Sequence, residues 1–514
     1  MACRSTCFIA ATLAILIGAC TLEPQYHRPA APVPALEGGT AGGTIAADIG
    51  WREFFPDPQL QQLIALALTN NRDLRVAVLN VQSAQAQYRI QRSQLFPTVD
   101  ASAVEQVQHI PIGVLAAQTP GGAAGGAGSP PTSGITEHTY DVEVGFTNYE
   151  LDLFGRIRSL SHAALQQYFS SGETRRNVEL TLVAEIATAY ITVLADQTLL
   201  DITRNTLKSQ ENSYALTEKL FNGGTSTELA LRQAETTVDT AKANIAQYNR
   251  QLAQDRDALQ LLLGAPIPDS IDFSRGLDRG NMVSELEEGI RSDVLVRRPD
   301  VLAAEHQLMA SNAQIGAARA AFLPAISLTG NFGTESTQLS GLFKGGSGTW
   351  SFSPQISVPI FAGGANVANL QATKLARDTA VAQYEKAIQT AFQEVADALV
   401  ARGTLDDQLA AQQALVTASE KAYRLADMRY RGGVDTYLNA LVAQISLYSA
   451  EQQLQSVRLL RLQNLVTLYK ALGGGLKERA AAAQTRLEPP RSKISLPHSG
   501  PSASGDTRPR TVFG

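Results

Sequence analysis

The residue types that most often carry catalysis do not form a catalytic pattern in this sequence. The six histidines are scattered, with no spacing typical of a metal site: His27, His109, His138, His162, His306 and His498. The sequence also lacks His-Glu-x-x-His, a phosphate-cradling glycine loop before a helix, and Gly-x-Ser-x-Gly. We therefore expect no enzymatic activity, and the net charge of −5 favours no nucleic-acid partner.

One residue, Cys20, has a context that predicts a covalent modification. Residues 8–19 form an uncharged, mostly apolar run that follows Arg4. This run is shorter than the roughly 20 residues that span a bilayer, so residues 1–19 are predicted to be a signal peptide. Ile17-Gly18-Ala19-Cys20 resembles a bacterial lipoprotein box, in which the cysteine receives a diacylglycerol and an N-acyl chain. The alternative is an ordinary signal peptide with an incidental cysteine. No other cofactor is expected.

The residues around Cys20 also predict where the chain resides. Cys3 and Cys7 lie in the segment that would be removed, so the mature chain keeps only Cys20 and cannot form an internal disulfide. Thr21 follows, whereas an aspartate there would be the familiar signal for retention at the inner membrane. By that resemblance, we expect the chain to be anchored in the outer membrane of a bacterium and to extend into the periplasm.

Two long helical hairpins dominate the rest of the chain. Apolar residues at coiled-coil spacing over residues 380–472 predict two antiparallel helices that reverse at Arg431-Gly432-Gly433-Val434, with arms on the order of 55–80 Å. Phe221-Asn222-Gly223-Gly224 lies 209 positions (430 − 221) before Tyr430-Arg431-Gly432-Gly433. A fixed internal offset indicates duplication, so hairpins are predicted over 155–264 and 363–472.

A second repeated pattern precedes each hairpin, a helical segment that ends at a proline and is followed by alternating apolar and polar residues. Period-two alternation predicts strands, each long enough to cross a membrane at a tilt. A small soluble sheet would show the same alternation. We predict helical parts at 58–97 and 286–324, and strand regions 98–154 and 325–362. The expected strands are 98–109, 139–153, 325–338 and 348–361, with external loops at 110–138 and 339–347.

The remaining segments are predicted as connections. Residues 20–57 are rich in proline, glycine and alanine and are expected to form an extended tether. Residues 265–285 join the two repeats, and residues 473–514 are expected to be a disordered tail. The predicted fold class is an internally duplicated α+β membrane protein.

The number of strands predicts an oligomer. Four strands cannot close a barrel, and an open sheet edge is not tolerated in lipid. Two chains would give eight strands, whose interior is filled by side chains, and three would give twelve strands, which can hold a channel. The trimer is therefore preferred, and it would also place twelve long helices in a ring.

Several motifs in a fixed order are similar to one known family. They are the lipoprotein box, the leader Pro24-Gln25-Tyr26-His27-Arg28-Pro29, the two hairpin reversals and the closing run Leu468-Tyr469-Lys470-Ala471-Leu472-Gly473-Gly474-Gly475. Together they resemble the TolC-type outer-membrane efflux factors, with the NodT-type lipoprotein branch as the closest match. The resemblance covers residues 17 to 475.

This resemblance implies a homotrimeric conduit with a twelve-stranded barrel in outer-membrane lipid and a twelve-helix periplasmic tunnel. The conduit would dock a periplasmic adaptor (membrane-fusion) protein and an inner-membrane pump, often of the resistance-nodulation-division class, and export drugs or other toxic small molecules. The adaptor-docking positions that it implies are the hairpin tips, which contain Gly223, Gly224, Thr225, Gly432, Gly433 and Val434.

The resemblance also implies a narrow periplasmic aperture just beyond the second tip. Family members often place aspartates at the positions of Asn439 and Val442, and neither residue is acidic here. What remains is a polar and apolar constriction formed by Tyr437, Asn439 and Val442.

Two rival functions stay open on the residues alone. A type I protein-secretion channel would have the same architecture with a different cargo. A periplasmic structural lipoprotein built on coiled coils would require the four alternating segments to be soluble.

Overall fold

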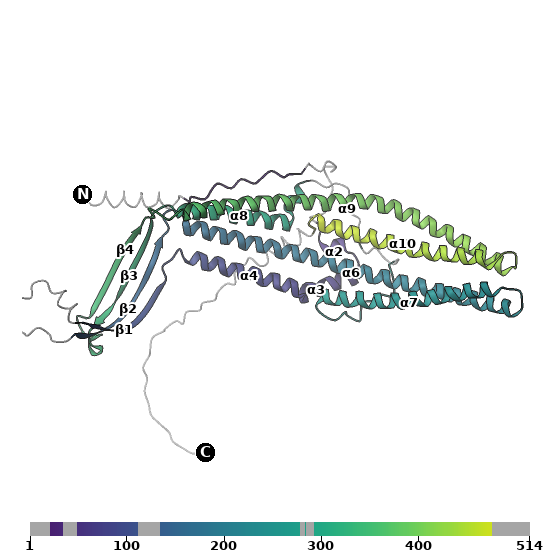
Figure 1. Ribbon diagram of the computed structural model, residues 1–514, viewed down its shortest axis with the longest axis horizontal. Coiled ribbons are helices and arrows are strands. Elements are labelled where there is room, and N and C mark those ends of the chain that lie inside the picture. The colour runs from purple at the N-terminus through teal and green to yellow at the C-terminus, as the bar shows by residue number, and fades with distance from the viewer. Residues whose placement is uncertain (1–20, 34–48, 112–133, 278–282, 284–291, 475–514) are drawn as a thin grey trace, which may run out of the picture.

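The protein is elongated, with a β-sheet at one end and helices that extend away from it (Figure 1). The computed structural model describes residues 21–33, 49–111, 134–277, 283 and 292–474. The predicted signal peptide, Cys20 and the tail beyond residue 474 lie outside this part of the chain. The fold class predicted from the sequence is confirmed, since four strands stand on long helical hairpins.

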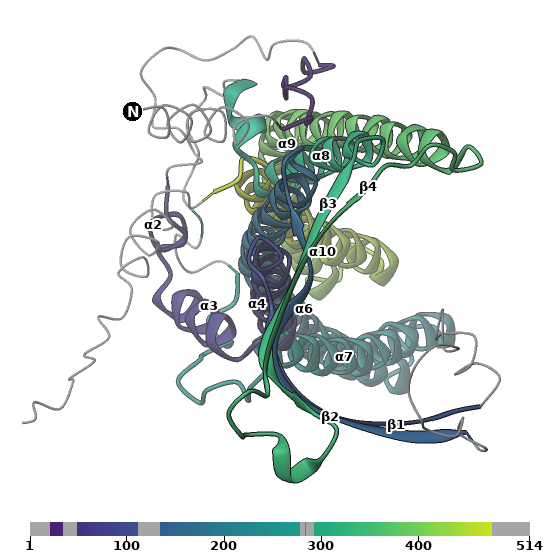
Figure 2. The same ribbon diagram turned by 90° about the vertical axis from the view of Figure 1, so that its left-hand side faces the viewer.

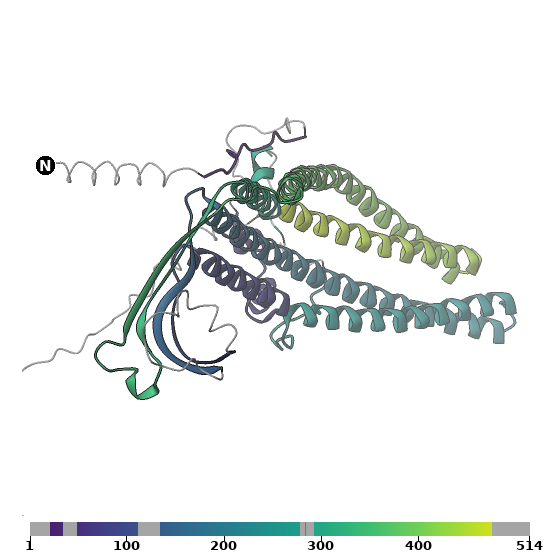
Figure 3. The same cartoon turned by 60° about the vertical axis from the view of Figure 1, so that its left-hand side comes forward.

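Four helices form the two hairpins. The first hairpin consists of α6 (Arg156–Asn222) and α7 (Glu228–Leu263), and the second of α9 (Ala365–Arg431) and α10 (Tyr437–Ala471). The hairpins lie side by side and point in the same direction (Figure 3). Helices α6 and α9 each contain 67 residues, roughly 100 Å at 1.5 Å per residue. The predicted arm length is too short for these two, because the buried seam of α9 begins only at Ala380.

Shorter helices precede each pair of strands. They are α2 (Trp51–Phe54), α3 (Pro58–Asn70) and α4 (Arg72–Ser93) in the first half, and the 3-10 helix η2 (Ser292–Arg297) and α8 (Pro299–Ala320) in the second. Asp57 and Asn71 cap α3 and α4, each accepting a hydrogen bond from a backbone N–H of the first turn. Pro58 and Pro299 occupy the first helical positions, where a missing N–H costs nothing.

The sheet is antiparallel, in the order β1 (Val99–Ile110), β2 (Ile135–Leu151), β3 (Ala325–Ser336) and β4 (Gly348–Ser357). Figure 2 shows that it is strongly curved. Strand β2 begins within the predicted external loop 110–138, and the loop before β4 contains the short helix η3 (Leu339–Gly341). Strand β4 ends at Ser357 instead of residue 361, and Pro359, which has no N–H to donate to a ladder, lies just beyond.

The register gives the sheet one apolar and one polar face, because directly opposed residues of antiparallel strands share a face. On the apolar face Val144 opposes Ala101 and Phe332, and Phe332 opposes Trp350. Both of these aromatic side chains are more than two-thirds exposed. The polar face contains Asp141 opposite Glu335 as well as Ser102, Glu143, Asn331, Ser351, Ser353 and Gln355.

The apolar core lies where the helices meet, beyond the sheet. The middle of α6 is fully buried at Ile186, Tyr190 and Leu194, and packs with α3, α7 and the end of α10. This segment of α6 is long and apolar enough to cross a membrane by composition. Because 61% of it is buried within the protein, we interpret it as a core helix.

A buried arginine connects several elements within the second half of the chain. The Arg298 side chain forms ion pairs with Asp300, 2.8 Å away, and with Glu394 of α9, 2.7 Å away. It also donates a hydrogen bond to the carbonyl of Ala471 at the end of α10. One guanidinium therefore ties the start of α8 to both helices of the second hairpin.

Residues 21–33 of the predicted extended tether, here named the leader, lie against the helices. Arg28 forms a bidentate ion pair with the buried carboxylate of Glu305 in α8, with Nη2 to Oε2 at 2.6 Å, and Tyr26 donates to the same carboxylate. The leader is the dark trace along the helices in Figure 1. At Gly316 it passes so close that a Cβ there would lie 2.9 Å from the backbone of Glu23. Side chains about 280 positions away in the sequence therefore bind the leader to α8.

Candidate functional site: the hairpin tips

The ends of the hairpins that lie farthest from the sheet contain the residues predicted to dock a partner. The first tip joins α6 to α7 over residues 223–227, and the second joins α9 to α10 over residues 432–436. Figures 1 and 3 show the two tips next to each other at the same end of the molecule.

The two tips have the same backbone structure. At the first, Gly224 has φ +74°, and the N–H groups of Gly224 and Thr225 donate to the carbonyls of Phe221 and Leu220. At the second, Gly433 has φ +69°, and the corresponding bonds run from Gly433 to Tyr430 and from Val434 to Arg429. This is the Schellman ending of a helix, which requires a left-handed residue that glycine adopts at little cost. Gly223 and Gly432 precede it in right-handed conformations.

A small polar network stabilises the second tip. One carboxylate oxygen of Asp435 accepts hydrogen bonds from the N–H of Thr436, at 2.8 Å, and from the amide of Asn439, at 2.7 Å. Its other oxygen pairs with Arg429, 3.2 Å away. These hydrogen bonds lower the pKa of Asp435, so the carboxylate stays charged and holds the turn that precedes α10.

The structure does not bring the three predicted aperture residues onto one exposed surface. Tyr437 is 6% exposed and packs between the hairpins, with its ring 5.3 Å from that of Tyr430 and against Ala234. Burial raises the pKa of Tyr437 to about 12, so its phenol is neutral. Asn439 is bound to Asp435, and Val442 is 55% exposed.

Hydrogen bonds between hydroxyl groups connect the two hairpins above the tips, and we name them the tyrosine ladder. Its three rungs, each at 2.9 or 3.0 Å, are Thr217–Tyr430, Ser209–Tyr423 and Thr203–Tyr448. In the first rung Thr217 donates to the carbonyl of Ser213, so Tyr430 is the donor. The coiled-coil spacing over residues 380–472 did not identify the ladder, although Tyr423 and Tyr430 lie one heptad apart.

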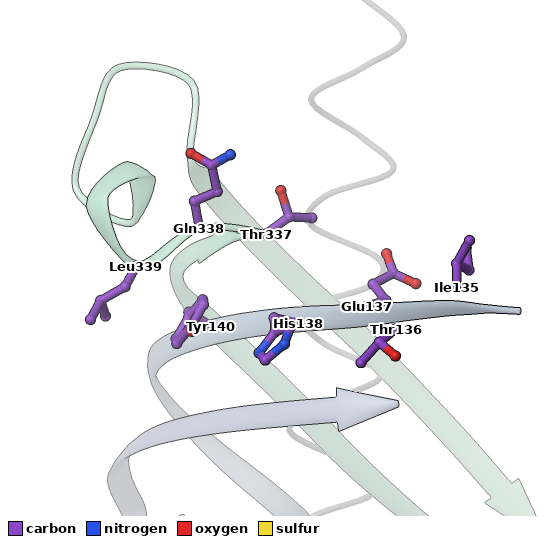
Figure 4. Close-up of a pocket in the computed structure, with 8 residues that line it drawn as sticks. All are labelled: Ile135, Thr136, Glu137, His138, Tyr140, Thr337, Gln338 and Leu339. Atoms are coloured by element: carbon purple, nitrogen blue, oxygen red, sulfur yellow. The ribbon is translucent and has the colours of Figure 1, made fainter. Parts of the chain in front are cut away.

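A hollow at the sheet end of the molecule does not have the geometry of a binding site. It has a volume of about 550 Å³ and lies between the start of β2 and the β3–β4 loop. In Figure 4 the side chains of Glu137 and Gln338 point to one side of the strand, and those of His138 and Tyr140 to the other. Because the polar groups do not converge, this hollow gives no binding geometry.

We expect substitutions in the tyrosine ladder to loosen the hairpins. The double variant Tyr423→Phe with Tyr430→Phe removes two hydrogen bonds, each worth about 1 kcal/mol, without changing the packed rings. Hydrogen exchange near the tips, measured by mass spectrometry, should accelerate by roughly tenfold or more. Thr417→Val is the control, since Thr417 is exposed and bonds only to its own helix, at Gln413. Unchanged exchange in the double variant would show that the ladder does not hold the hairpins together.

Three comparisons identify what the chain resembles. It is 47% identical over 490 residues to the antibiotic efflux pump outer membrane protein ArpC and to the toluene efflux pump outer membrane protein TtgC, both of Pseudomonas putida. Each alignment covers 94% of this chain and 98% of the relative. The open state of the MtrE outer membrane channel of Neisseria gonorrhoeae superimposes with a TM-score of 0.79 at 42% identity, over 89% of this chain and 99% of that one.

The model of the outer membrane efflux protein family matches residues 63–265 and 290–474. These two matched segments contain the two halves of the duplication, each with its strands and its hairpin. The outer-membrane location predicted from the sequence is confirmed by the family and by the relatives. With most of its length matched, the chain belongs to the outer membrane efflux protein family.

Proposed function

We propose that this chain is the outer-membrane conduit of a tripartite efflux pump, a passive trimer that exports toxic small molecules. The observation that carries the proposal is the sheet, which is apolar on one face and polar on the other and has two open edges. A sheet of this kind suits a wall with lipid outside and water inside.

The open edges of the sheet support a trimer. Within the part of the chain that the structure describes, strand β1 and strand β4 each pair on one side only. In hydrocarbon their remaining N–H and C=O groups must bond to another strand. Pairing β4 of one protomer with β1 of the next closes twelve strands in three chains, a number that leaves room for a channel. The polar face, with Asp141, Glu143 and Glu335, would then line the lumen.

The cargo class is proposed from the named relatives and from the chemistry of the lumen. ArpC is named for antibiotic efflux and TtgC for toluene efflux, so hydrophobic toxic compounds are the expected cargo. Within the described strands the polar face offers hydroxyls, amides and carboxylates, which give an apolar molecule little to bind. Such a conduit lets cargo pass without holding it, and the energy would come from the inner-membrane pump.

The hairpin tips are proposed to dock the periplasmic adaptor. At Gly224 and at Gly433 a Cβ would have no neighbour within 4 Å, and Val434 is 69% exposed beside them. Bare backbone and an exposed apolar side chain suit close approach by a partner helix. Asn439 and Val442 remain our proposed aperture residues, with Tyr437 supporting them from within.

The route of the leader supports lipid attachment at Cys20. The carbonyl of Leu22 accepts a hydrogen bond from Arg319 in the last turn of α8, just before β3 begins at Ala325. Cys20 is two positions before Leu22 in the sequence. A diacylglycerol and N-acyl chain there would meet the membrane surface at the base of the sheet.

Deleting the gene and measuring intracellular accumulation tests the function. We expect toluene and several antibiotics to accumulate in the deletion strain, and a plasmid copy of the gene to reverse this. Unchanged accumulation of every compound, together with a protein-secretion defect, would contradict the proposal and favour a type I secretion channel.

Substitutions at the second tip test adaptor docking. We expect Gly433→Trp to leave trimer formation intact and to abolish cross-linking to the adaptor. Gly433→Ala is the matched control, because both variants bear the strain of a left-handed residue, roughly 1–2 kcal/mol, and only Trp adds bulk. Loss of cross-linking in both variants would assign the effect to tip conformation, and normal cross-linking of the Trp variant would contradict docking at this tip.

Metabolic labelling with radioactive palmitate tests the lipid anchor. We expect Cys20→Ala to abolish labelling because the acceptor thiol is lost. Cys7→Ala should label normally, since Cys7 lies in the predicted signal peptide. Continued labelling of the Cys20 variant would refute attachment at this residue.

A further inference from the structure

Four side chains form a continuous chain of hydrogen bonds between the leader and both halves of the protein. Nδ1 of His162, in α6, lies 3.0 Å from both carboxylate oxygens of Glu23 in the leader. The other ring nitrogen of His162 lies 3.0 Å from Nε2 of Gln166. Oε1 of Gln166 lies 2.8 Å from Nδ1 of His306, which belongs to α8. The chain therefore runs Glu23, His162, Gln166, His306.

The arrangement of donors defines one protonation state. The amide N–H of Gln166 donates to Nε2 of His162, so that nitrogen carries no proton and His162 is neutral with a proton on Nδ1. The amide oxygen of Gln166 in turn accepts the proton on Nδ1 of His306. Gln166 is 91% buried, so bulk water cannot readily replace either bond.

A second proton on His162 would require a different arrangement. Nε2 of His162 would become a donor and would face the N–H of Gln166, so the amide of Gln166 would have to rotate by half a turn. Its oxygen would then accept from His162, and its N–H would donate to Nδ1 of His306. His306 would release its Nδ1 proton to water and take one on Nε2, so the net uptake is one proton, on His162.

We propose that these four residues form a pH-sensitive clasp, which holds the leader to α6 and α8 more tightly in acid than in base. The clasp goes beyond the conduit function and does not depend on cargo or pump. It would act close to the sheet, where the leader reaches the last turn of α8.

The surrounding charges favour protonation of His162, and so a tighter clasp, as the pH falls. Hydrogen bonding to Glu23 and its charge raise the pKa of His162. Burial lowers the pKa of His306, although Glu173 and Glu305 oppose this effect, and Arg176 adds to it. His162 is therefore the histidine of the pair that gains a proton first. Because its pKa is raised on folding, the stabilisation is fully present below about pH 6.5 and is lost as pH rises through the folded pKa.

Other contacts attach the leader to the helices and do not involve a histidine. The Arg28–Glu305 ion pair, the bond from Asn312 to the carbonyl of Pro24 and the bond from Arg319 to Leu22 hold it without a histidine. Histidine is the side chain whose ordinary pKa lies between pH 5 and 8. The clasp therefore adjusts the strength of attachment and leaves the leader in place at neutral pH.

Hydrogen exchange of the leader in the full-length protein in lipid nanodiscs tests the proposal. Protection of residues 21–33, corrected for the intrinsic exchange rate at each pH, is measured from about pH 5.5 to about pH 8.5. We expect protection to fall roughly two- to tenfold with rising pH, because the ion pair between charged His162 and Glu23 is lost. The lower part of this range allows for solvent screening, because water reaches 42% of the His162 side chain.

Two variants and one spectrum decide the outcome. Glu23→Gln keeps a hydrogen-bond acceptor and removes the charge, so the pH dependence should disappear. His27→Gln changes the exposed histidine of the leader and should keep the pH dependence. In the unmutated protein, nitrogen NMR of labelled histidine should show the His306 proton on Nδ1 at high pH and on Nε2 at low pH. A pH dependence that survives in Glu23→Gln, vanishes in His27→Gln or leaves the His306 tautomer unchanged would overturn the proposal.

Discussion

The constraint on which the rest of the structure depends is that backbone polar groups cannot stay unpaired in hydrocarbon. The sheet pairs β1 with β2, β2 with β3 and β3 with β4, and leaves one edge of β1 and one of β4 open. A chain with this sheet is incomplete by itself in a membrane. Pairing of those two edges with other copies of the chain would explain three features together. These are the curvature of the sheet, its separate apolar and polar faces, and the common direction of the hairpins.

The contacts between the two hairpins change in character from the core toward the tips. Apolar packing dominates at Ile186, Tyr190 and Leu194, far from the tips. Nearer the tips, only a small apolar cluster around Tyr437 and Leu441 remains, and hydroxyl pairs such as Thr217–Tyr430 supply the contacts between hairpins. Water can replace hydroxyl bonds at low cost, so the hairpins are held together less strongly near the tips than in the apolar core.

The sequence predicted features that depend on local pattern. Alternation located all four strands, and the paired glycines at Gly223-Gly224 and Gly432-Gly433 located both reversals, because a left-handed turn needs glycine. Contacts between distant residues could not be predicted in this way. The leader binds Glu305 from about 280 positions away, and the proline-rich composition that predicts an extended tether gives no sign of this contact. The burial of Tyr437 depends on how the second hairpin packs on the first, which no periodicity within one helix reveals.

The equal length of α6 and α9 has a geometric consequence. Both helices start after a left-handed glycine at the base of the sheet, Gly155 and Gly364, and both continue for 67 residues. The two reversals therefore end at a common level, and three protomers would present six of them as a flat rim. Removing a single turn from only one helix would recess its reversal by about 5.4 Å. The two tips therefore stay at the same level only if α6 and α9 are lengthened or shortened by the same number of residues.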